Sequence, residues 1–209
     1  MVHIDQVFIL LGVVLVSMTL HEAMHAFMSY WLGDDTAERE GRLTLNPLAH
    51  IDPFLTILLP VVLLLSGGPL FGGAKPVPFN PSRVRYNEFG AMLVGIIGPL
   101  TNLLLAFITF GLYVLTGGAF FGDILKIAVT INLGFFVFNM LPIPPLDGSR
   151  LLYYLAPKSA RKIMESMEQY GIFIILILVL LFGQFFGTYM LEAIHFFLNI
   201  FAAIFGAVL

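Results

Sequence analysis

Cysteine is absent from this sequence of 209 residues. Without it the chain can form no disulfide, and any metal ion it binds must be held by nitrogen and oxygen ligands rather than thiolates. Charge is also scarce, because Asp, Glu, Lys and Arg make up only 11% of the residues and the formal net charge is −3. No basic cluster is dense enough for a nucleic-acid surface, so nucleic acid is not an expected partner.

Hydrophobic residues, in contrast, make up 59% of the chain. Such a chain has too few polar groups to cover itself in water. Several apolar runs reach the roughly 20 residues that a helix needs to cross the hydrocarbon core of a lipid bilayer. We therefore predict an all-α polytopic membrane protein with five or six transmembrane segments and a three-helix core. The expected segments cover residues 7–32, 54–65, 89–115, 124–141, 172–186 and 189–209.

The segment at residues 54–65 is shorter than a usual span and contains Pro60. It therefore either crosses the bilayer in distorted form or re-enters on the same side. Glycine and proline dominate residues 67–88. Because proline removes backbone donors and disfavours a helical neighbour, this stretch is predicted to be an extended loop or hairpin.

Basic residues collect in two of the expected loops. The positive-inside rule places both loops on the cytoplasmic side of the membrane. The first loop carries Lys75, Arg83 and Arg85, and the second carries Arg150, Lys158, Arg161 and Lys162.

The first apolar segment contains the pattern H-E-x-x-H at residues 21–25. On a helix His21 and His25 lie one turn apart on the same face, so both imidazoles can reach one metal ion. Glu22 beside them can act as general base on a zinc-bound water. The alternative is a chance pattern of core residues, which the cost of an unpaired glutamate in mid-membrane, roughly 2.5–3.5 kcal/mol, disfavours.

Two histidines are too few for a catalytic zinc site, which commonly has three protein ligands and a water. The best candidate for the third is Asp147, at the end of the proline-rich stretch 139–148. Prolines open a helix and allow a carboxylate to turn toward a cavity rather than toward lipid. An aspartate followed by a glycine is also an ordinary turn, and the residues alone do not decide between the two interpretations.

The motifs together resemble the site-2 proteases, a family of intramembrane zinc metalloproteases that cut transmembrane helices. The resemblance rests on HEAMH at residues 21–25, GPLTN at 98–102 and NMLPIPPLDG at 139–148. It implies that His21, His25 and Asp147 bind one zinc ion and that Glu22 activates water. We expect a catalytic membrane core at residues 1–155, followed by a polar linker and two C-terminal transmembrane helices at 156–209.

Two asparagines in apolar helices, Asn102 and Asn139, are further candidate catalytic residues. Their amides can donate to an oxyanion or hold the ligand helices in place, but either can equally be a packing amide between helices. Gly90, Gly95 and Gly98 are expected only to allow close helix packing.

The predicted function is hydrolysis of peptide bonds in or near transmembrane helices of single-span membrane proteins, as in regulated intramembrane proteolysis. The expected location is a prokaryotic cell membrane. The alternative is a non-catalytic protein that binds or transports divalent metal, and a third possibility is an inactive relative that only binds substrate. A carrier would have no need of Glu22 and would more often show its ligands in paired repeats, which are not evident here.

Overall fold

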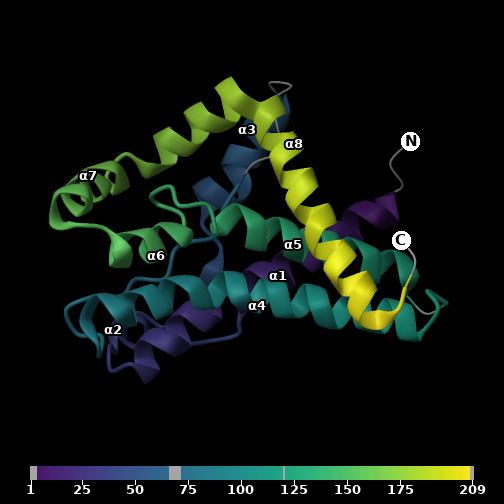
Figure 1. Cartoon of the computed structure of the whole chain (residues 1–209), viewed down its shortest axis with the longest axis horizontal. Coiled ribbons are helices and arrows are strands. Elements are labelled where there is room, and N and C mark those ends of the chain that lie inside the picture. Colours follow the sequence, from purple (N-terminus) through teal and green to yellow (C-terminus); the bar gives the residue numbers. More distant parts are fainter. Residues whose placement is uncertain (1–3, 66–71, 120, 208–209) are drawn as a thin grey trace.

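The computed structural model describes residues 4–65, 72–119 and 121–207 (Figure 1). These residues form helices joined by turns and irregular segments, and they contain no β-strand. The all-α prediction is therefore confirmed. The helices are α1 (Ile4–Trp31), α2 (Thr36–Arg39), η1 (Pro47–His50), η2 (Pro53–Leu58), α3 (Leu59–Leu65), α4 (Asn87–Leu115), α5 (Gly122–Asn139), α6 (Gly148–Leu155), α7 (Lys158–Glu168) and α8 (Gly171–Phe205).

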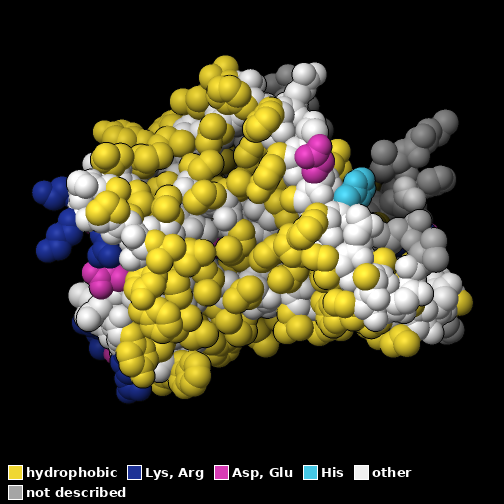
Figure 2. All heavy atoms as spheres, in the orientation of Figure 1, with side chains coloured by type: hydrophobic (Ala, Val, Ile, Leu, Met, Phe, Trp, Pro, Cys, Tyr) yellow, Lys and Arg dark blue, Asp and Glu magenta, His cyan; other side chains and the backbone are white. Residues whose placement is uncertain are grey.

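Within the described residues, four helices are long and apolar enough to cross a membrane. They are Gln6–Trp31 in α1, Asn87–Leu115, Gly122–Asn139 and Leu180–Phe205 in α8. The sequence predicts five or six spans, and the difference arises at two places, residues 53–65 and the C-terminal helix. Most of the face in Figure 2 is hydrophobic, as expected for helices that face lipid.

The short apolar segment consists of a six-residue π-helix, η2, followed by the seven-residue α3. Its chain returns to where it began, because the N–H of Gly73 donates to the carbonyl of Leu55 at 3.0 Å. The hydroxyl of Thr56 also donates to the carbonyl of Gly73 at 2.7 Å. Because the chain after this segment returns to the residues at its start, the segment matches the re-entrant alternative and not a helix that crosses the bilayer.

The C-terminal element α8 covers 35 residues and contains two helical stretches that meet at a kink, and the sequence also predicts two helices in this region. Its backbone leaves helical geometry only at Phe182, with φ −117° and ψ 19°. The predicted break lies near Gly187, but no proline occurs in α8. A glycine lowers helix propensity by about 1 kcal/mol without removing a hydrogen bond, so the helix continues through it.

The helices α1, α4 and α5 pack against one another, and α4 also contacts α6 and α8. A buried apolar cluster between α4, α5 and α8 includes Phe110, Leu133 and Phe201. The expected three-helix core is therefore present. It brings one face of α1 against α4, close to the turn between α5 and α6.

The two basic loops lie at the same end of the molecule. An ion pair of 2.8 Å joins Arg161 on α7 to Glu88 at the start of α4, next to the loop that carries Arg85. In Figure 2 the Lys and Arg side chains gather at the left end, where Figure 1 places α2 and α7. That this end faces the cytoplasm stays a prediction from the positive-inside rule.

Labelling of single cysteines tests this topology, because the chain has no cysteine of its own. We expect Lys75→Cys and Lys162→Cys to react with a membrane-impermeant reagent from the cytoplasmic side. Ala119→Cys, in the turn between α4 and α5, should react only from the other side. Labelling of positions 75 and 162 from opposite sides would contradict the arrangement.

Candidate metal centre

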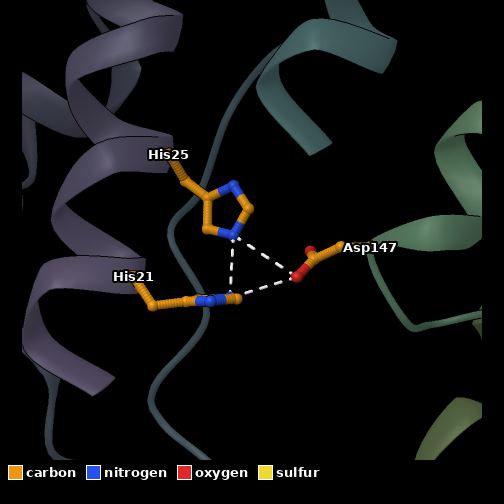
Figure 3. A group of neighbouring side chains, drawn as sticks. All are labelled: His21, His25 and Asp147. Carbon is orange, nitrogen blue, oxygen red and sulfur yellow. Dashed lines mark hydrogen bonds and ion pairs between the residues drawn. The ribbon is translucent and has the colours of Figure 1, made fainter. Parts of the chain in front are cut away.

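The two histidines lie on one face of α1, as their spacing predicts. His21 and His25 are buried, with 6% and 8% of their surface exposed. Their Nε2 atoms point toward one another and lie 3.1 Å apart (Figure 3). Both residues lie inside the candidate span Gln6–Trp31, so the pair is placed within the apolar part of the molecule.

Asp147 reaches these histidines from the turn between α5 and α6 (Figure 3). Its Oδ2 lies 3.1 Å from Nε2 of His21 and 3.5 Å from Nε2 of His25. Although Asp147 precedes α6, its side chain makes no capping hydrogen bond to that helix. The carboxylate is directed to the histidines, so the structure brings together all three predicted ligands.

The glycine after Asp147 makes this turn possible. A Cβ at Gly148 would lie 2.3 Å from the carbonyl oxygen of Met140, at the end of α5. Only glycine allows the two backbone segments to approach this closely. The Asp-Gly pair therefore forms a turn that also directs the carboxylate of Asp147 toward the histidines. The two alternatives that the sequence left open, a turn and a metal ligand, are compatible.

The outer nitrogen of each histidine has an acceptor. Nδ1 of His25 lies 2.6 Å from the carbonyl oxygen of Val94, and Nδ1 of His21 lies 2.6 Å from Oδ1 of Asn102. A carbonyl oxygen can only accept, so Nδ1 of His25 carries the proton. With Nδ1 protonated in both rings, the Nε2 lone pairs point toward Asp147, which is the tautomer that a metal ligand needs.

The geometry of this cluster fits zinc. The three atoms are 3.1–3.5 Å apart. Ligand atoms about 2.0–2.1 Å from a tetrahedral zinc would lie roughly 3.3 Å from one another. Two imidazoles and one carboxylate are also a common catalytic zinc set, which leaves a fourth position for water.

Asn102 is fully buried in α4 and uses both ends of its amide. Its Oδ1 accepts from His21, and its Nδ2 donates to Oδ1 of Asn132 on α5 at 2.9 Å. Nδ2 of Asn132 in turn donates to Oγ of Ser17 on α1 at 2.9 Å. Because the donors of Asn102 are engaged, the arrangement favours orientation of His21 over donation to an oxyanion.

Sequence reasoning missed Asn132 and Ser17. Both are buried, and both carry the hydrogen-bond chain that holds Asn102. The signal was present, since Asn132 is a polar residue in an apolar helix and Ser17 lies one turn before His21. Ser17, His21 and His25 therefore form a polar stripe along α1.

Removal of this support should weaken zinc binding. We expect Asn102→Leu to lower zinc affinity by about 10–100-fold, the usual cost of losing a partner of a metal-bound histidine. Competition with a zinc chelator measures the affinity without any substrate. Asn139→Leu is the matched control, and an equal loss in both variants would show that Asn102 has no special relation to His21.

Asn139 lies at the C-terminal end of α5, outside this hydrogen-bond chain. Its Nδ2 donates to the carbonyl oxygen of Phe135 in the same helix at 3.0 Å. The structure therefore does not join Asn139 to the three ligands, and its catalytic role stays a prediction.

Glu22 is half-buried beside the two histidines and is not one of the three converging ligands. No hydrogen bond to its carboxylate is found within the part of the chain that the structure describes. It interacts electrostatically with the guanidinium of Arg42, a buried residue that the sequence did not single out. Its role as general base stays a prediction.

Gly98 on α4 lies directly against the converging ring nitrogens. A Cβ there would be 2.3 Å from Nε2 of His25 and 2.8 Å from Nε2 of His21. The sequence predicts only a packing role for Gly98. In the structure the absence of its side chain leaves room for the Nε2 atoms of His21 and His25 themselves.

The comparison with known proteins agrees with this geometry. The chain is 43% identical over 174 residues to a Bacillus subtilis (strain 168) protein named "Putative zinc metalloprotease YwhC", a match that covers 78% of this chain and 76% of that relative. The profile of peptidase family M50 matches residues 116–183, which include Asp147. The chain belongs to peptidase family M50. The resemblance to site-2 proteases is thereby confirmed.

Other relatives of this M50 peptidase carry the same description in their names. It is 34% identical over 178 residues to the Rip2 protein of Mycolicibacterium smegmatis, covering 79% of this chain and 64% of that one. It is 32% identical over 187 residues to Rip2 of Mycobacterium tuberculosis (strain H37Rv), covering 83% and 68%. The protein is therefore a membrane metalloprotease of the zinc-dependent type. No solved structure matches the chain.

Substitution of the three residues tests them as zinc ligands. We expect purified wild-type protein to hold one zinc ion per chain. The double variant His21→Ala, His25→Ala should hold none, and Asp147→Asn should lose most of it, because an amide binds zinc more weakly than a carboxylate. Metal analysis decides the matter. Unchanged zinc in the double variant would show that the site is elsewhere.

Proposed function

We propose that this M50 peptidase cleaves peptide bonds in or near transmembrane helices of single-span membrane proteins, at a zinc site within the membrane of a bacterial cell. One observation carries the proposal: two imidazole Nε2 atoms and the carboxylate of Asp147 converge inside a candidate membrane span. The names of the bacterial relatives support the metalloprotease part.

In this proposal His21, His25 and Asp147 hold the zinc. When bound, zinc supplies a Lewis acid that lowers the pKa of water and polarises the substrate carbonyl. Asn102 and the carbonyl of Val94 keep the Nδ1 atoms of the two histidines protonated, so that the Nε2 atoms stay free as ligands. Because His21 and His25 are only 6% and 8% exposed, bulk water has limited access to them.

Glu22 takes a proton from the attacking water and later returns it to the leaving amine. Its position supports this role, because adjacent residues on a helix point about 100° apart. Glu22 therefore lies beside the metal-binding face of α1 rather than on it. Its carboxylate has no hydrogen bond among the described residues, so it is available to water.

A substrate helix must unwind before attack, since its peptide bonds are shielded by their own hydrogen bonds. We propose that the unwound stretch pairs with the segment 75–80 as an added strand. This segment is anchored at both ends. The N–H of Lys75 donates to the carbonyl of His50 at 2.9 Å, and that of Asn80 donates to Oδ2 of Asp34 at 2.6 Å. Arg42 also donates to the carbonyl of Lys75.

The prolines of this segment restrict how such pairing can occur. Pro76 and Pro78 have no N–H and can only accept. Val77 and Phe79 alternate with them, and within the described residues their backbone groups make no hydrogen bond. A substrate strand would therefore pair with Val77 and Phe79.

Reconstitution with a reporter tests the function. We expect purified protein in liposomes with zinc to cut a single-span reporter helix, and a chelator to stop the reaction. A carrier would instead move zinc across the liposome membrane and leave the reporter intact. Zinc transport without cleavage would replace the protease proposal by the carrier alternative.

A further inference from the structure

A cleft of about 810 Å³ lies along the C-terminal half of α1, and none of the three zinc ligands lines it. Its apolar wall contains Met24, Phe27 and Met28. Together with Trp31 these residues follow helical spacing and form one stripe on the surface of α1. Phe27 and Trp31 are 39% and 75% exposed, so the stripe is open to its surroundings.

The end of the cleft carries aromatic residues at the level where α1 leaves the membrane. Tyr30 and Trp31 line the cleft and are the last two residues of the candidate span. Aromatic residues at the end of a span lie at the level of lipid headgroups, because their rings are apolar and their N–H or O–H groups are polar.

Arg85 brings a cation to this same place. It lines the cleft, and its backbone N–H donates to the carbonyl of Leu32 at 2.8 Å. Its side chain lies over Gly33, where a Cβ would be 3.6 Å from Nε of Arg85. Within the part of the chain that the structure describes, the guanidinium of Arg85 forms no hydrogen bond or ion pair.

The guanidinium of Arg85 is not needed as a hydrogen-bond donor to the carbonyls at the C-terminal end of α1. Backbone N–H groups already satisfy the carbonyls at the end of α1, at 2.9–3.0 Å. The donors belong to Leu32, Gly33 and Asp34, and the acceptors to Met28, Tyr30 and Ser29 respectively. The guanidinium of Arg85 is therefore available to a ligand.

Two charged residues line the cleft, Arg85 and Asp35. Its one carboxylate, Asp35, is paired with Arg39 and, at 2.9 Å, with Arg83. Desolvation would raise the pKa of Asp35, but these two guanidinium groups hold it below its usual value. Asp35 is therefore neutralised by its own partners, and Arg85 keeps its charge for a ligand.

We propose that this cleft binds an anionic phospholipid, with an acyl chain along the stripe of α1 and the phosphate at Arg85. A free phosphate would make no use of the apolar wall. A zwitterionic lipid would gain less from the guanidinium of Arg85, because its net charge is zero. The inference does not depend on proteolysis.

Trp31 allows a direct test, because it is the only tryptophan in the chain. Lipids with brominated acyl chains quench tryptophan fluorescence on close contact. The protein is reconstituted in phosphatidylcholine that contains a small fraction of brominated phosphatidylglycerol or, separately, of brominated phosphatidylcholine. We expect enrichment of the anionic lipid at Trp31 on the order of fivefold, the factor that corresponds to the roughly 1 kcal/mol supplied by one basic residue near an anionic surface.

Two variants separate the site from general attraction by surface charge. Arg85→Gln should abolish the preference for the anionic lipid, while Lys162→Gln, which removes an equal charge from an exposed residue that does not line the cleft, should keep it. Unchanged zinc content shows that both variants fold. Equal quenching by both lipids in the wild type, or an equal loss in both variants, would overturn the proposal. So would loss of the preference on addition of inorganic phosphate at constant ionic strength, or protection of Trp31 from both lipids by a second copy of the chain.

Discussion

Replacement of Glu22 by glutamine should leave zinc bound and stop peptide cleavage. Glu22 is adjacent to His21 but is not among the three residues whose ligand atoms converge. Zinc content should therefore equal that of the wild type. The amide of glutamine cannot accept a proton at neutral pH, and general base catalysis contributes on the order of 10²–10⁴-fold. The rate of reporter cleavage should fall by at least this factor.

Metal analysis and cleavage are measured on the same preparation of the glutamine variant. Glu38→Gln, at an exposed glutamate on α2, is the control for loss of one negative charge outside the site. It should cleave at the wild-type rate. Cleavage at that rate by Glu22→Gln would refute the proposed mechanism. Loss of zinc from it would instead give Glu22 a ligand or structural role and would favour the metal-carrier alternative.

The two histidines of the candidate metal site could be predicted from the sequence, because they lie close together along the chain. The spacing of His21 and His25 fixes their common face through helical geometry alone. Asp147 lies 126 positions from His21, and its placement depends on how α5 ends and on the turn before α6. The prolines and Gly148 indicated a turn, but only the packed structure shows where the carboxylate points.

Other parts of the site have no signature in the sequence. The partner of His25 Nδ1 is the backbone carbonyl of Val94, and every residue has such a carbonyl. The amide of Asn132 contributes through a contact between helices, so its importance depends on which face of α5 meets α4. These features are consequences of packing, which composition and periodicity do not specify.

The fold, too, has parts that the sequence predicts and parts that it does not. Hydropathy and length were sufficient for α1, α4 and α5, whose limits are close to those predicted. They placed the break of α8 near Gly187 instead of Phe182, and they left open whether the segment at residues 54–65 crosses the bilayer or returns toward Leu55. Both outcomes depend on tertiary contacts and on the tolerance of a helix for glycine.

The glycines of α4 show how similar residues acquire different roles. Gly90, Gly95 and Gly98 look alike in the sequence, as small residues that permit close packing. In the structure a Cβ at Gly90 would meet the backbone of Arg85, and one at Gly95 would meet the side chain of Arg150. Only at Gly98 would it meet the Nε2 nitrogens of His21 and His25, the candidate zinc ligands.

Gly98→Ala should therefore abolish zinc binding although it adds a single methyl group. That methyl would lie 2.3 Å from Nε2 of His25 and 2.8 Å from Nε2 of His21, so the rings must move from the positions in which they converge with Asp147. We expect the loss of zinc affinity to exceed the roughly 10–100-fold typical of an indirect partner of a ligand. Cleavage of the reporter should be lost with it.

Gly134→Ala is the matched control for this substitution, because Gly134 is also inside a long helix and a Cβ there has no neighbour within 4 Å. Both changes raise helix propensity by about 0.5–1 kcal/mol, so they differ mainly in what the methyl group touches. Gly134→Ala should keep zinc and activity. If Gly98→Ala retains wild-type zinc affinity, the rings can shift without loss of the site, and the close contact of α4 with the histidines is not required for metal binding. If both variants lose zinc to the same extent, the effect comes from helix packing in general and not from the position of Gly98 against His21 and His25.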